Sequence, residues 1–161
     1  MNRGARSHPA ADAATGVHDA VIASAWRGPG PAQVEDSTPV FILPAQPLPP
    51  MIQRQIAALP DGLAQRLAAI SATRTPSAAL PLPAGTALVD SGESRRIQEE
   101  GYGGAVMLAV SPVAFSDDST HALVYLEQHC GPVCGSGKVV WLARDSRGRW
   151  RVRGEVVTTM Q

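Results

Sequence analysis

The fold is decided by residues 121–153, HALVYLEQHCGPVCGSGKVVWLARDSRGRWRVR. This stretch contains three segments of strand-forming residues, separated by a glycine-rich turn and by the turn DSRG. Strand segments joined by tight turns are typical of a β-meander, in which neighbouring strands are antiparallel. We therefore predict consecutive antiparallel strands over residues 108–157. Because side chains alternate between the faces of a strand, Ala122, Val124 and Leu126 should share one face.

The N-terminal half predicts helices joined by proline-rich connectors. Apolar residues recur at helical spacing over residues 16–27, where Thr15 can cap the start, and over residues 50–71, where Pro60 divides a helix pair. We expect the apolar stripe of this pair to be core. Residues 38–43, with Phe41 inward, and residues 86–90 read as short strands, and residues 93–101 as one or two helical turns. The predicted fold class is α+β, with N-terminal helices packed on a C-terminal antiparallel β-meander sheet.

Domain organisation follows from length and composition. A chain of 161 residues is the size of one ordinary domain. Residues 1–14 lack apolar periodicity, so we predict a disordered N-terminal segment there. Residues 15–161 then form a single domain, with a helical and proline-rich part over 15–103 and the meander over 104–157.

Charge and hydropathy exclude several classes of protein. With 14 basic and 14 acidic side chains, the chain has no net field that would draw it to nucleic acid, which we regard as an unlikely partner. No apolar run is long enough to cross a membrane, so we expect no membrane span. The first residues also contain no hydrophobic segment of the signal-peptide type.

The C-terminal part carries four short motifs. They are F-S-x-D at residues 115–118, A-L-V-Y at residues 122–125, C-G-x-x-C-G-x-G at residues 130–137, and Trp150 in the last strand. In this order they resemble a loose group of uncharacterised bacterial proteins, over roughly residues 104–157. The resemblance implies a shared fold of unknown activity, often in proteins with export signals. This chain departs from the group in lacking such a signal.

The two cysteines, Cys130 and Cys134, flank the glycine-rich turn. In an oxidising compartment we predict that they form a structural disulfide, and in a reducing one that they remain two thiols. A redox pair of the thioredoxin type needs a helix N-terminus, and a zinc site needs two more ligands that His121 lies too far along the strand to supply. We therefore expect no metal and no cofactor, and keep a thiol-dependent redox protein as an alternative function.

Three arginines, Arg149, Arg151 and Arg153, alternate with Trp150 and Val152. This period-two pattern predicts a strand that is wet on one face. A solvated outer face that resists aggregation is the simplest interpretation. An anion-binding or nucleic-acid-binding strand over residues 144–153 is the alternative, although no aromatic residues for base stacking share the arginine face.

Catalytic motifs are missing from the sequence. Residues 135–138, GSGK, lack the flanking residues of a phosphate-binding loop, and neither H-E-x-x-H nor G-x-S-x-G occurs. We therefore predict a non-catalytic binding or interaction domain, with an unknown protein or small-molecule partner. The cysteine pair and the resemblance favour the bacterial cell envelope or the secreted space.

Overall fold

The computed structural model describes residues 9–43, 49–100, 106–131 and 134–160. The helices are α1 (Pro9–Ala25), α2 (Pro50–Ala57), α3 (Leu63–Ile70), the 3₁₀ turn η1 (Ser77–Ala79) and α4 (Ser91–Glu100). The strands are β1 (Gln33–Glu35), β2 (Ala87–Val89), β3 (Met107–Val110), β4 (Ala114–Phe115), β5 (His121–Gly131), β6 (Cys134–Arg144) and β7 (Trp150–Met160).

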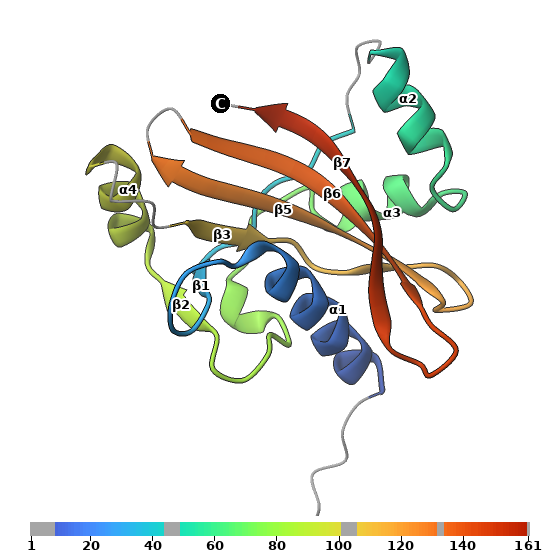
Figure 1. Ribbon diagram of the computed structural model, residues 1–161, viewed down its shortest axis with the longest axis horizontal. Helices are drawn as coiled ribbons and strands as arrows, with labels where there is room; N and C mark the ends of the chain where they lie inside the picture. The colour runs from blue at the N-terminus through green and yellow to red at the C-terminus, as the bar shows by residue number, and fades with distance from the viewer. Residues whose placement is uncertain (1–8, 44–48, 101–105, 132–133, 161) are drawn as a thin grey trace, which may run out of the picture.

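A single mixed sheet forms the centre of the molecule (Figure 1). Its strand order is β2-β1-β3-β5-β6-β7, with β4 paired to β5. Strands β5, β6 and β7 form the predicted antiparallel meander, and β3 joins it in antiparallel register. Beyond this antiparallel part the sheet is mixed, because β1 pairs in parallel with both β2 and β3. Parallel neighbours require crossover connections, and helices α2 and α3 lie in the connection from β1 to β2.

Two hydrophobic layers cover the two faces of the sheet. On one face α1 packs through Val17, Val21, Ile22 and Ala25, and the strands contribute the predicted set Ala122, Val124 and Leu126. On the other face α3 and the segment before α2 pack on the sheet. Their side chains Phe41, Leu63 and Leu67 meet Leu123, Tyr125 and Val139. The predicted α+β packing of N-terminal helices on the meander is therefore confirmed (Figure 1).

Helix α1 begins earlier than the sequence pattern indicates. It starts at Pro9, so the prediction of disorder is wrong for residues 9–14, whereas residues 1–8 lie outside the described residues. Proline is tolerated at the first helical position, and the alanines that follow are strong helix formers. Thr15 is not a cap, since its hydroxyl donates to the Ala11 carbonyl within the helix at 2.9 Å. Packing against β7 extends the helix, and a Cβ at Gly16 would lie 3.1 Å from the Trp150 ring.

The predicted strand over residues 38–43 is absent. Strand β1 lies just before it, and residues 38–43 are extended without pairing in the sheet. Their backbone bonds to a loop instead: the Thr38 N–H donates to the Thr75 carbonyl at 2.9 Å and the Phe41 N–H to the Ser71 carbonyl at 3.1 Å. Pro39 lacks the N–H that a ladder needs. Phe41 is nevertheless buried, as predicted.

Strand β7 contains two irregularities that change its side-chain pattern. Leu142 pairs with Val152 but Trp141 pairs with Gly154, so Arg153 is an extra residue in a β-bulge. A second irregularity lies further along β7. Lys138 pairs with Val157 but Gly137 pairs with Thr159, so Thr158 is the extra residue. Because the strand itself begins at Trp150, Arg149 precedes it. The period-two alternation predicted that the three arginines line one regular strand face, and in the structure they do not.

Candidate functional site

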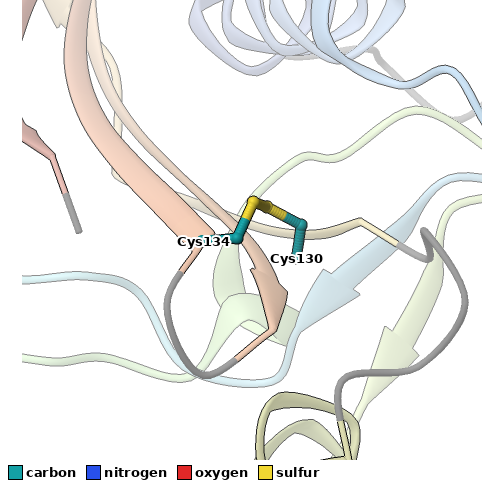
Figure 2. The surroundings of a disulfide bond; sticks show 2 residues. All are labelled: Cys130 and Cys134. Atoms are coloured by element: carbon teal, nitrogen blue, oxygen red, sulfur yellow. A yellow bond between two sulfur atoms is a disulfide. The ribbon is translucent and has the colours of Figure 1, made fainter.

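A disulfide joins Cys130 and Cys134 at the end of the β5–β6 hairpin (Figure 2). The two Cα atoms are 5.1 Å apart, within the usual range for this bond. The predicted pairing is thus present. Both cysteines lie in strands, and no described helix begins at either of them. The helix N-terminus that lowers the thiol pKa in reactive dithiols is therefore missing here, and sulfurs bonded to each other are not available as zinc ligands.

Gly137 of the cysteine motif lets the Tyr125 side chain cross strand β6. A Cβ at this position would overlap the Tyr125 hydroxyl and lie 2.5 Å from Thr159 Oγ1. The phenol thereby reaches β7, where it bonds with the side chains of Thr158 and Thr159. Burial is the main reason that the pKa of Tyr125 is raised, and the nearby charge of Glu127 adds to the effect. The last glycine of the motif thus serves a close packing contact.

Next to this crossing, side chains from three elements form a polar cluster, which we call the His129 cluster. It consists of Glu35 on β1, Ser94 on α4, and Glu127 and His129 on β5. His129 Nε2 lies 3.1 Å from Glu127 Oε2 and 4.0 Å from Glu35 Oε1. Ser94 Oγ donates to Glu35 Oε1 at 2.5 Å. The cluster therefore ties α4 to the end of the hairpin that carries the disulfide.

The electrostatics of the His129 cluster favour the imidazolium form. The hydrogen bond to Glu127 is the largest cause of a raised pKa of His129, and it outweighs burial, which lowers that pKa. The charge of Glu35 also raises it, and that of Arg74 lowers it. A cavity of about 60 Å³ adjoins Glu127 and His129, enough for one or two water molecules. The cluster can hold a proton, but the Ser94 hydroxyl is bonded to Glu35 and forms no nucleophile–base pair with the imidazole.

Sequence reasoning treated His129 only as a neighbour of the cysteines and missed the cluster. One local signal was present. Leu123, Tyr125, Glu127 and His129 occupy alternate positions of one strand, so two ionisable residues follow two apolar ones on the same face. Such a change of polarity marks where the core ends. Nothing local indicated that Glu35 and Ser94 would meet this pair.

The arginines predicted as a candidate anion site surround the β6–β7 turn. Asp145 organises this turn: its carboxylate accepts the backbone N–H groups of Arg147 and Arg149, each at 2.9 Å, and Arg151 Nε at 3.2 Å. These bonds lower the pKa of Asp145, and the backbone bond from Arg149 is the largest cause. Arg149 and Arg151 also border a cleft beside α1, whereas Arg153 does not. Another cleft, of about 250 Å³, is lined by Arg151 and Arg153. The structure thus places Arg151 beside each of the other two arginines but does not gather all three at one cleft.

An apolar groove of about 360 Å³ lies between α2 and β7, and we call it the α2–β7 groove. It is lined by Met51, Ile52, Gln55, Glu155, Val157, Thr158 and Thr159. The prediction that the stripe of this helix is core is confirmed for Ile52 and Ile56, which are partly buried and pack against the core, and is wrong for Met51. Met51 is 62% exposed and Val157 41% exposed. Among the described residues that line the groove, Glu155 is the one with a charged side chain, and its carboxylate is paired with Lys138 Nζ at 3.0 Å.

Metal binding and membrane insertion find no support in the described part of the chain. Among the residues that the structure describes, no three His, Cys, Asp or Glu side chains are grouped so that they could hold a metal ion. None of the described helices is both long and apolar enough to cross a bilayer. Comparison with known proteins finds no family model, no curated protein and no solved structure that matches the chain.

Proposed function

We propose that this chain is a non-catalytic binding domain that takes an extended, uncharged segment of a partner protein into the α2–β7 groove. The observation that carries the proposal is an exposed apolar groove beside an edge strand. Exposed apolar side chains gathered in a hollow are typical of interaction sites. Met51 and Val157 are the two large apolar side chains that the groove leaves open to solvent.

The backbone of β7 offers hydrogen bonds to such a segment. This strand is the last in the order of the sheet and pairs only with β6 in the part of the chain described. Its outer N–H and C=O groups therefore have no neighbouring strand, and an extended peptide can add to such an edge. Arginines protect the first half of β7, whereas residues 155–160, EVVTTM, contain one charged residue, Glu155, and a bulge at Thr158.

The chemistry of the groove selects its occupant. Because Lys138 already neutralises Glu155, no unpaired charge of the groove is left to attract a charged ligand. Apolar side chains at alternate positions of an added strand would point towards Met51 and Val157, and the others towards solvent. An uncharged segment with alternating apolar and small polar residues therefore fits best.

The compartment is part of the same proposal. Disulfides persist in oxidising compartments and are rare in the cytosol. The bond between Cys130 and Cys134 therefore supports a location in the cell envelope or outside the cell. We infer that the partner is another protein of that space.

A capped peptide of alternating valine and threonine, labelled with a fluorophore, tests the proposal by fluorescence anisotropy. We expect saturable binding to the intact protein. Met51→Glu should weaken it about tenfold or more, because the groove would then desolvate an unpaired carboxylate. The matched control is Ala57→Glu, which adds the same charge to an exposed position of α2 outside the groove.

A second peptide distinguishes strand addition from general stickiness. In it every backbone amide nitrogen is methylated, so that the peptide keeps its side chains but loses all its backbone donors. The proposal requires that this peptide binds much more weakly. Equal binding of the two peptides, or equal loss of binding in Met51→Glu and Ala57→Glu, would refute it.

A further inference from the structure

A cleft of about 470 Å³ lies between the first half of α1 and the β6–β7 turn, and we call it the α1 cleft. In Figure 1 the start of α1 lies beside the hairpin of β6 and β7. Asp12 and Asp19 line the helical side, with Gly16 between them, and Arg144 and Arg149 line the hairpin side near Trp150. The volume is that of a site for a small ligand. This cleft is separate from the α2–β7 groove and shares no lining residue with it.

Opposite charges face the cleft without neutralising one another. Among the described residues, neither Asp12 nor Asp19 forms an ion pair, and neither Arg144 nor Arg149 has a carboxylate partner. Asp12 and Asp19 are seven positions apart on one helix, so two turns of α1 separate them and both face the same side. The cleft therefore has a negative wall and a positive wall, both accessible to a ligand.

The hairpin holds the positive wall in place. The Arg144 guanidinium lies over the Trp150 ring, 5.0 Å from its centroid, which orients the planar group and leaves its N–H edge available. Trp150 itself is buried against α1 at Gly16. Asp145 fixes the backbone N–H of Arg149 at 2.9 Å. The arginines thus project from a turn that is already ordered.

We propose that the α1 cleft binds a short zwitterionic peptide, with its carboxylate on Arg144 and Arg149 and its ammonium group on Asp12 or Asp19. An anion alone would pair with one wall and bring its charge close to the carboxylates of the other, and a cation alone would meet the converse repulsion. A ligand with both charges satisfies both walls through charge-assisted hydrogen bonds. The volume exceeds what a single amino acid fills and suits a dipeptide.

Dialanine and two blocked analogues test the proposal. N-acetyl-dialanine lacks the ammonium group, and dialanine amide lacks the carboxylate. Binding is followed by the amide NMR shifts of Gly16 and Gly148, which line the cleft. We expect a saturable shift with dialanine and affinity lower by about tenfold or more for each analogue, because each loses one charge-assisted contact.

Two variants locate the contacts. Asp12→Asn and Asp19→Asn together should weaken dialanine binding about tenfold and remove its advantage over N-acetyl-dialanine, because the ammonium contact is then already lost. Arg149→Gln should weaken dialanine binding by a similar factor. Asp61→Asn and Arg54→Gln make the same chemical changes at exposed positions outside the cleft and should leave binding unchanged. Absence of a saturable shift with dialanine would overturn the proposal. So would equal affinity for N-acetyl-dialanine, which would indicate a simple anion site.

Discussion

Replacing Gly137 by alanine should destabilise the protein, because Tyr125 occupies the space of the new methyl group. The added Cβ would overlap the phenol oxygen and lie 3.0 Å from Tyr125 Cζ. Overpacking of this kind costs about 1–3 kcal/mol, whereas glycine-to-alanine replacement at an unstrained position gains about 0.4–1 kcal/mol from the unfolded chain. The overlap is with a ring held between strands, so the cost should prevail, with a net loss of about 1–2 kcal/mol.

Urea denaturation measures this loss as a change in the free energy of unfolding at constant m-value. The fall in Tm should be about 2–8 °C for a chain of this length. Gly154→Ala is the matched control in the neighbouring strand. There the nearest atom to a new Cβ is Trp141 Cε3 at 3.9 Å, an ordinary contact, so stability should stay the same or rise slightly.

A double-mutant cycle decides whether the phenol oxygen is the cause. Tyr125→Phe alone should cost about 1 kcal/mol, since it removes the bonds to Thr158 and Thr159. In that background Gly137→Ala should cost at least about 1 kcal/mol less than in the wild type, because the overlapping oxygen has gone. Additive effects of the two substitutions would refute the explanation given for Gly137.

Three further predictions concern the disulfide, the His129 cluster and the arginines. Replacing both Cys130 and Cys134 by serine should lower stability by about 2 kcal/mol under oxidising conditions only, and the wild type should show no turnover in an insulin-reduction assay; turnover would instead make it a redox protein. The pKa of His129 is raised above 6.5 in the folded state, so its contribution to stability is complete below that pH and is lost as pH rises through the folded pKa. The difference in unfolding free energy between the wild type and His129→Gln should therefore shrink with rising pH, and a constant difference would contradict the cluster's role. Finally, labelled DNA should show no salt-sensitive binding that Arg149→Ser, Arg151→Ser and Arg153→Ser together abolish, since Asp145 neutralises Arg151 and the chain carries no net charge.

The meander could be predicted from the sequence because its signals are local. Glycine-rich and aspartate-containing turns separate β5, β6 and β7, and Ala122, Val124 and Leu126 alternate with the residues of the opposite face. The cysteine spacing across one of these turns likewise predicted the disulfide. In each case the interacting residues are close along the chain, so the local sequence pattern is enough to predict the contact between them.

Only the tertiary structure decided where the remaining elements go. Strand β1 is three residues long and is defined by its pairing with β2 and β3, which lie far along the chain. The parallel part of the sheet therefore had no local sequence signal. The bulge at Arg153 arises from pairing with β6 and changes the face of the side chains that follow it, as far as the second bulge at Thr158. The candidate sites depend on the same long-range packing. Glu35 and Ser94 meet His129, and Asp19 faces Arg149, because the sheet and α1 bring distant segments together. Sequence patterns report the intrinsic preference of a segment, whereas these contacts form only when the whole core is buried.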